Sequence, residues 1–178
     1  MRARAAFLAA IFAFGVASAA SAQDRLYTAY NIWFEKPDRV YSTGYQKGNM
    51  LPAGSEVKEV QRSSRKLEFV DVKTNMKFTI DFFAKHHPGV KPEQWIERVL
   101  TTRNFSTLTK GLTADEIKAI KAGQVKVGMT RKAVLVSVGY PPEIATANPE
   151  LDVWKLWRDR FRNYEVKFTS GKVSSSAQ

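Results

Sequence analysis

The sequence of 178 residues contains no cysteine. The disulfide bonds that stabilise many small exported domains are therefore excluded, and stability must come from a packed core. The same absence removes the lipobox cysteine of a bacterial lipoprotein, so we expect no lipid anchor. Histidine is scarce too, since His86 and His87 are the only two. Neighbouring side chains on a strand point to opposite faces, so this pair predicts no metal site.

Catalytic motifs are also missing, because no GxSxG, HExxH or P-loop spacing occurs. Gly128-Met129-Thr130 could form a phosphate cradle at a helix N-terminus, but the single glycine and the lack of a P-loop lysine favour a tight turn into a helix cap. We therefore predict no enzyme and no cofactor. A hydrolase acting on cell-wall or lipid substrates stays an alternative that requires acids such as Asp81 and Glu97 to meet in one pocket.

Long apolar runs are limited to the first 22 residues. Arg2 and Arg4 precede a short apolar stretch, and Ala20-Ser21-Ala22 matches an A-x-A cleavage site. The pattern predicts a signal peptide over residues 1–22, with Gln23 as the mature start. The stretch is too short to span a bilayer comfortably, and no later one is apolar enough. We expect a periplasmic protein, soluble or peripheral to the outer membrane.

Acidic residues are few relative to basic ones, at 17 against 28, for a formal charge of +11. Cleavage of the signal removes Arg2 and Arg4 and lowers the charge by two, to +9. In an exported protein this excess favours anionic lipid head groups, lipopolysaccharide phosphates or acidic partners over nucleic acid. A merely basic surface that aids solubility is the alternative, because net charge says nothing about clustering.

Residues 23–90 contain short β-type runs separated by turns. In the last run, residues 76, 78, 80 and 82 are apolar and alternate with polar residues, as in a half-buried strand. We expect antiparallel strands forming a small curled sheet or SH3-like barrel. Residues 91–111 predict a helical linker, with Pro92 at the first helical position and a helix ending near Thr102.

Two helices are expected after residue 112. Thr113 and Glu116 form a capping box, and Gly123 can close the first helix. The second stretch, RKAVLVSV, has a strand-like apolar content, which keeps a strand as the alternative. Thr130 before it and Gly139 after it favour a helix, because the caps offset the weak helix propensity of valine.

The C-terminal part predicts strands. Tyr164, Val166 and Phe168 alternate with polar residues, and Ser170-Gly171 turns the chain into a last short strand. Residues 175–178 are expected to form a frayed tail.

The segment WKLWRDRFR holds the candidate binding residues, which are Trp154, Trp157, Arg158, Arg160 and Arg162. On an extended chain, arginines at a spacing of two project from one face. Arginine binds phosphate bidentately and tryptophan suits a membrane interface, so the segment predicts contacts with lipid or a partner. The alternative is that the tryptophans are core residues while the arginines are solvated or pair with Asp159 and Glu165.

The order of elements from residue 112 onward resembles the SmpA/OmlA, or BamE-type, domain of the outer-membrane β-barrel assembly machinery. The resemblance covers residues 112–174 and depends on framework positions: Gly123, Gly128, Met129, Thr130, Val134, Gly139, Pro141, Trp154, Val166, Phe168 and Gly171. It implies two helices packed on a three-stranded antiparallel sheet. It also implies a non-enzymatic periplasmic role in outer-membrane assembly or envelope integrity, through a membrane-associated or outer-membrane protein and anionic phospholipid.

Two features depart from that family: the missing lipid-attachment cysteine and the added β-rich module. The overall expectation is an α+β fold, in which a β-rich module precedes a two-helix, three-stranded domain. A periplasmic inhibitor or ligand-binding protein that uses its sheet face is the alternative function.

Overall fold

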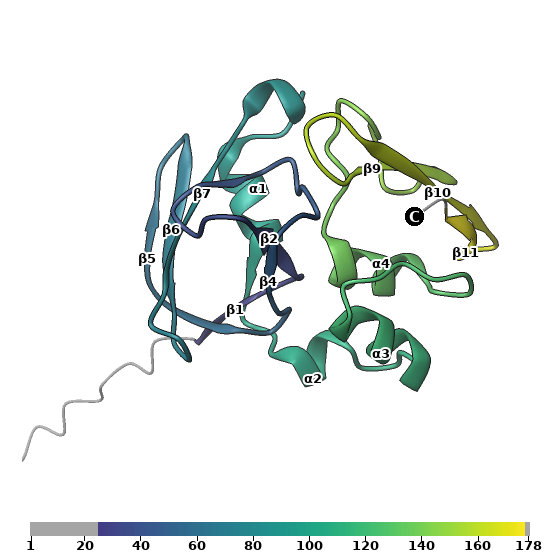
Figure 1. Cartoon of the computed structure of the whole chain (residues 1–178), viewed down its shortest axis with the longest axis horizontal. Helices are drawn as coiled ribbons and strands as arrows, with labels where there is room; N and C mark the ends of the chain where they lie inside the picture. Colours follow the sequence, from purple (N-terminus) through teal and green to yellow (C-terminus); the bar gives the residue numbers. More distant parts are fainter. Residues whose placement is uncertain (1–24, 177–178) are drawn as a thin grey trace, which may run out of the picture.

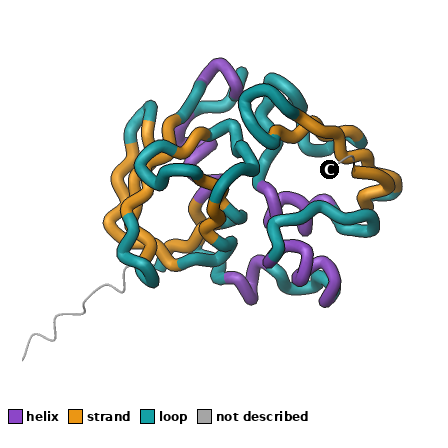
Figure 2. The backbone as a smooth tube through the Cα atoms, in the orientation of Figure 1, coloured by secondary structure: helices purple, strands orange, loops and turns teal. Residues whose placement is uncertain are grey.

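The computed structural model of the chain describes residues 25–176, so the predicted signal peptide lies outside the described residues. The fold is α+β: a curled mixed sheet in the shape of a half-barrel, then short helices, then a three-stranded antiparallel sheet (Figure 1). Figure 2 shows strands gathered on two sides of the molecule, with helical segments between and below them. The predicted fold class is confirmed, with a curled sheet in place of an SH3-like barrel.

Six strands make the N-terminal sheet, in the order β3-β7-β6-β5-β1-β8. Their bounds are β1 Leu26–Thr28, β3 Val40–Tyr41, β5 Glu56–Arg62, β6 Lys66–Asp71, β7 Lys77–Asp81 and β8 Leu100–Thr101. A separate pair, β2 Ile32–Phe34 and β4 Asn49–Leu51, closes over it. The expectation of antiparallel strands is wrong for β3, which pairs with β7 in parallel, with Val40 opposite Ile80.

The curled sheet wraps around helix α1 (Pro92–Val99), which begins with Pro92 as predicted. Trp95, Ile96 and Val99 lie on its buried face and pack against Phe69 and Phe78 of the sheet. The helix ends at Val99 rather than near Thr102, because Leu100–Thr101 becomes β8 and pairs with β1. The short elements η1 (Ala84–His86) and α2 (Phe105–Leu108) flank this segment.

Helices α3 (Ala114–Lys121) and α4 (Arg131–Val138) occupy the predicted positions. The Thr113 hydroxyl accepts from the Glu116 N–H, and the Thr130 hydroxyl accepts from the Ala133 N–H, so both predicted N-caps are confirmed. Helix α4 is therefore a helix despite its valines, and four of its five apolar side chains are buried.

The C-terminal sheet has the order β11-β10-β9, with β9 Val153–Trp157, β10 Asn163–Thr169 and β11 Lys172–Ser176. Tyr164, Val166 and Phe168 are buried against α3 and α4, as their alternation predicts. Ser170 and Gly171 both have positive φ, the conformation of a tight hairpin turn. Strand β11 runs through Ser176, two residues into the expected tail.

Within the described part of the chain, none of the helices has the length and apolar character needed to cross a membrane.

Candidate functional site

The predicted binding cluster is divided by the end of β9. Trp154 is fully buried in the C-terminal core, where its ring lies 4.6 Å from that of Phe168. Its indole N–H donates to the Pro149 carbonyl at 2.9 Å. Trp157 is half-buried, and its carbonyl accepts from the Gln46 N–H at 3.2 Å. Trp154 is thus a core residue, and Trp157 joins β9 to the loop that follows β3.

Residues 158–162 do not continue the strand, so the expectation of three arginines along one extended face is wrong. The chain turns because Asp159 accepts from the N–H groups of Phe161 and Arg162, both at 2.9 Å. Asp159 also pairs with the Arg162 guanidinium at 2.7 Å. The hydrogen bond from Phe161, followed by those from Arg162, lowers the pKa of Asp159 to about 2, so the carboxylate stays ionised.

In this turn, each of the three arginines has a different environment. Arg162 is neutralised by Asp159, and Arg158 lies over the Tyr164 ring at 5.4 Å. Arg160 is exposed, has no anionic partner among the described residues, and lies 5.1 Å from the Phe161 ring centroid. Phe161 itself is 81% exposed, which is unusual for a side chain of that size.

Two adjoining hollows lie beside this turn, with volumes of about 310 and 260 Å³. Both are lined by Tyr41, Tyr45 and Arg160, so we treat them as one area and call it the turn surface. Its lining is rich in aromatic and basic side chains, namely Trp33, Phe34, Arg39, Tyr41, Tyr45, Lys47, Phe83, Lys85, His86, Arg160 and Phe161.

Acids of the turn surface are already paired. Glu35 pairs with Lys47 at 2.8 Å, and Asp159 pairs with Arg162. Arg39, Lys85 and Arg160 have no ion pair with any side chain that the structure describes. A hollow lined by aromatic rings and next to unneutralised cations matches an amphiphilic anion, which offers both an apolar part and a negative head group.

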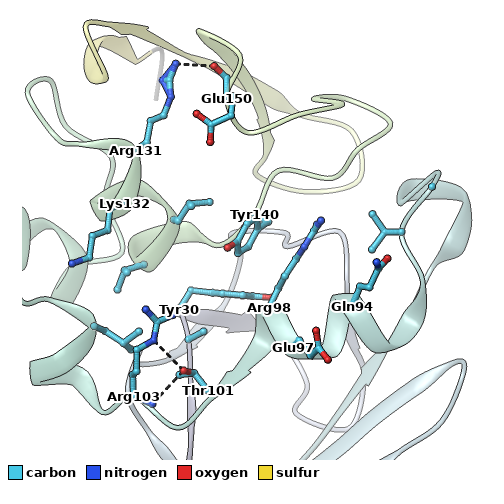
Figure 3. Close-up of a pocket in the computed structure, with 16 residues that line it drawn as sticks. Tyr30, Gln94, Glu97, Arg98, Thr101, Arg103, Arg131, Lys132, Tyr140 and Glu150 are labelled. Carbon is cyan, nitrogen blue, oxygen red and sulfur yellow. Dashed lines mark hydrogen bonds between the residues drawn. The ribbon is translucent and has the colours of Figure 1, made fainter.

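A second cavity of about 810 Å³ opens between the curled sheet and helix α4 (Figure 3). We call it the cleft. Arg103 and Lys132 lie on one side of it, Tyr140 and Arg98 in the middle, and Gln94 and Glu97 on the other side. Tyr30, Leu135, Val136 and Leu108 contribute to its apolar lining. The cleft therefore combines residues of both modules, which is a common setting for ligand sites.

Arg98 organises the middle of the cleft. Its guanidinium lies 5.0 Å from the Tyr140 ring centroid and pairs with Glu143. Burial raises the pKa of the nearby Tyr30 phenol, and Tyr140 adds to the increase while Arg98 opposes it. Tyr30 is consequently a neutral phenol that can donate or accept a hydrogen bond.

A chain of polar groups runs through the interior beside the cleft. The Ser42 hydroxyl lies 3.0 Å from Nε2 of His87, and Nδ1 of His87 lies 2.7 Å from Glu143. This is the connectivity of a catalytic triad. Ser42 and His87 are buried, however, and the hollow beside Ser42 holds only about 20 Å³. The arrangement joins the two modules and offers a substrate no access.

The two adjacent histidines have separate partners, as their side chains face apart. Nδ1 of His86 lies 2.6 Å from the Thr43 hydroxyl, whereas His87 contacts Ser42 and Glu143. Burial, with smaller contributions from Lys85 and His87, lowers the pKa of His86. Among the described residues no group of three histidine or acidic side chains could hold a metal ion.

The framework positions of the family resemblance lie away from both surfaces, with two exceptions: Gly139 packs against Tyr30 of the cleft, and Gly123 packs against Trp33 of the turn surface. Gly128 and Gly171 have positive φ in turns, Thr130 caps α4, and Pro141 is buried. These residues shape the C-terminal domain and contribute no binding group of their own.

The acids Asp81 and Glu97 do not meet. Glu97 lines the cleft, while Asp81 ends β7 and contacts Lys66 at 3.9 Å. The hydrolase alternative required acids such as these to meet in one pocket, and Asp81 and Glu97 do not.

Most residues of the turn surface, Tyr41, Tyr45, Phe83 and Lys85 among them, were not singled out from the sequence. These four lie more than 70 positions before Arg160. Tertiary folding brings them to the turn from two places: Tyr41 and Tyr45 come from β3 and the loop after it, and Phe83 and Lys85 come from the segment after β7. The aromatic spacing Tyr41-x-x-x-Tyr45 is a weak signal that could have marked them.

No family model, curated protein or solved structure matches the chain.

Proposed function

We propose that this chain is an exported, non-catalytic protein of the cell envelope that docks on anionic phospholipid through the turn surface. The observation that carries the proposal is the exposure of Phe161 beside cations without an ion pair, namely Arg39, Lys85 and Arg160. An aromatic side chain at a turn can enter the interface of a bilayer while neighbouring cations contact the phosphates. The role would be support of outer-membrane assembly or envelope integrity from the periplasmic side.

Liposome co-sedimentation tests the lipid contact. We expect binding to vesicles of phosphatidylcholine with about 30% phosphatidylglycerol, and weak binding to phosphatidylcholine alone. Each cation near the surface contributes about 1 kcal/mol, so Arg160→Glu should weaken binding roughly 10-fold or more. Lys73→Glu is the matched control, because Lys73 makes the same charge change in the exposed β6–β7 turn. Equal binding to neutral vesicles, or none to either, would rule out the electrostatic docking.

The absence of catalysis is a separate prediction. Ser42 has triad-like partners, so it is the one described serine that a fluorophosphonate probe would be expected to label if the group were active. We expect no labelling of the folded protein, because Ser42 is buried beside a hollow of about 20 Å³. Labelling that disappears in Ser42→Ala would show the chain to be a serine hydrolase.

The alternative of a ligand-binding or inhibitory protein that uses its sheet face finds less support. The outward side chains of β9 and β10 are mainly polar, including Lys155, Glu165 and Lys167, with Val153 and Trp157 as the apolar members of that face. The cleft is better suited to a ligand than that face.

A further inference from the structure

The two hollows of the turn surface differ in charge. The larger one is lined by Glu35 and Asp159 as well as by cations. The smaller one, of about 260 Å³, is lined by no carboxylate of the residues that the structure describes. It lies where η1 comes beside the loop between β9 and β10 (Figure 1). Apart from Phe83, its lining residues all carry polar groups, namely Tyr41, Thr43, Tyr45, Lys85, His86 and Arg160. A ligand of the smaller hollow therefore has to bring negative charge and hydrogen-bond acceptors.

The two cations of the smaller hollow lack a partner of opposite charge. Lys85 and Arg160 form no ion pair with any described side chain, and the nearest acid in sequence, Asp159, pairs with Arg162 at 2.7 Å. Arginine contacts phosphate through two N–H groups, and lysine adds a compact charge. The pair therefore suits a phosphate whose oxygens can accept from both sides of the hollow.

His86 is held in a fixed orientation at the same hollow. Its Nδ1 lies 2.6 Å from the Thr43 hydroxyl, and its ring stacks on that of Phe83 with the centroids 5.9 Å apart. Phe83 in turn packs on Tyr41 at 5.3 Å. Nε2 of His86 has no hydrogen-bond partner among the described residues. The ring is thus positioned from one side, while Nε2 is left for a ligand.

The charge of His86 should respond to a bound anion. Burial lowers the pKa of His86, and the neighbouring Lys85 and His87 add to the decrease, so the ring is neutral at pH 7 without a ligand. Arg160 faces the same hollow and has the same sign of charge. An anion at hydrogen-bond distance favours the protonated ring, and binding is then coupled to proton uptake.

We propose that the smaller hollow is a subsite for a terminal phosphate on a membrane lipid, held by Lys85, His86 and Arg160. A terminal phosphate is a monoester, which carries about −1.5 to −2 charges at pH 7 because its second pKa is about 6. The diester of phosphatidylglycerol carries a single charge and has one fewer free oxygen. The inference rests on the proposed function and names the head group that the turn surface selects, whereas docking on anionic lipid in general does not require it.

Vesicles of matched surface charge test the selection. Phosphatidylcholine is mixed with either phosphatidic acid, a monoester, or phosphatidylglycerol, and the two contents are adjusted to the same zeta potential. We expect the unaltered protein to bind the phosphatidic acid vesicles at least about 5-fold more tightly. His86→Gln keeps an N–H donor but cannot become charged, so it should reduce this ratio to about 1. Lys85 is exposed, so Lys85→Gln should fold and should lower the ratio as well. Lys118→Gln, with the same charge change on the exposed face of α3, should leave the ratio unaltered.

A soluble probe tests the subsite without a membrane. The imidazole signal of His86, identified by its loss in His86→Gln, is followed by NMR over pH with and without saturating glycerol 3-phosphate. We expect the monoester to raise the pKa of His86 by about 0.5 or more, and the diester dimethyl phosphate to raise it by less than about 0.2. His87 provides the control signal, because both of its ring nitrogens already have partners, at Ser42 and Glu143.

Equal affinity for the two kinds of vesicle, a preference that survives in His86→Gln, or an equal response of His86 to the two soluble esters overturns the proposal. Absence of binding to both kinds of anionic vesicle contradicts membrane docking instead. The titration with glycerol 3-phosphate then decides by itself whether the smaller hollow binds a terminal phosphate.

Discussion

The carboxylate of Glu116 stabilises two helices at once. One oxygen accepts from the N–H and hydroxyl of Thr113, the N-cap of α3, at 2.8 and 3.1 Å. The other accepts from the N–H and hydroxyl of Thr130, the N-cap of α4, both at 2.8 Å. The capping box of α3 could be predicted because its residues are three apart. The bond to Thr130, which is 14 residues away, depends on how the helices pack and could not.

Replacement of Glu116 by glutamine should destabilise the protein. Glutamine has a single acceptor oxygen, and its amide N–H groups would face donors, leaving buried groups without partners. We expect a loss of about 2 to 4 kcal/mol in the free energy of unfolding, measured by urea denaturation. Glu165→Gln, on the exposed face of β10, should change it by less than about 0.5 kcal/mol. Equal stability of Glu116→Gln and the unaltered protein would show that these bonds contribute nothing.

The same carboxylate gives a pH dependence with a defined sign. Burial raises the pKa of Glu116, but the hydrogen bonds from Thr113 and Thr130 outweigh it, so the folded-state pKa is below the ordinary 4.5. A depressed pKa means that the stabilisation is present above the unfolded-state pKa and is lost as the pH falls through the folded-state pKa. The difference in stability between the unaltered protein and Glu116→Gln should therefore shrink below about pH 4.5.

At the scale of elements, the glycine that ends α4 also makes a long-range contact possible. Gly139 was predicted as the helix stop, and it has φ +80° and ψ −172°, a conformation that is nearly restricted to glycine. A Cβ at this position would also lie 2.9 Å from ring atoms of Tyr30. The glycine therefore both ends the helix and lets the N-terminal module approach it.

Gly139→Ala should cost about 3 kcal/mol or more, because strain and overlap with Tyr30 add. Gly128→Ala is the comparison, since Gly128 has φ +90° but an added Cβ there would meet nothing within 4 Å, so that strain alone should cost about 1 kcal/mol. Thermal unfolding of the two variants measures the difference. A similar melting temperature for both would mean that the Tyr30 contact is unimportant.

Some strands could be predicted from a local pattern, whereas pairings between distant strands could not. The strand pattern of residues 164–168 predicted β10 correctly, because alternation reflects a sheet with one buried face. The parallel pairing of β3 with β7 joins residues 40 positions apart and has no local signal. Arg160 and Trp154 were both predicted as binding residues. Arg160 lines the turn surface, whereas Trp154 is a core residue because the C-terminal sheet buries its apolar inner face.

At the scale of the whole molecule, the two modules are joined through buried polar contacts. The Asn31 amide donates to the carbonyls of Ile120 and Ser137 at 2.6 and 2.9 Å, and its oxygen accepts from the Ala53 N–H at 2.7 Å. The contacts of His87 with Ser42 and Glu143 form a second connection. Breaking either leaves buried groups unpaired, so the modules should not unfold independently.

The chain should accordingly unfold in one cooperative transition. Tryptophans occur in both cores, as Trp95 and Trp154, so fluorescence and far-ultraviolet circular dichroism should give the same midpoint. Asn31→Ala should lower the unfolding free energy by about 3 kcal/mol, while Asn163→Ala, at an exposed position of β10, should have little effect. Two separated transitions in the unaltered protein would contradict the coupling.

Docking on anionic phospholipid through the turn surface is the central claim, and the lack of cysteine allows a direct measurement of it. A single cysteine introduced by Phe161→Cys can carry an environment-sensitive nitrobenzoxadiazole label at a unique position. Lys73→Cys provides the control, because it lies in the turn before β7, at the opposite end of that strand from Phe83. With vesicles that contain phosphatidylglycerol, we predict a blue shift and a rise in emission at position 161 and none at position 73. An unchanged spectrum at position 161, or equal changes at both, would contradict the account.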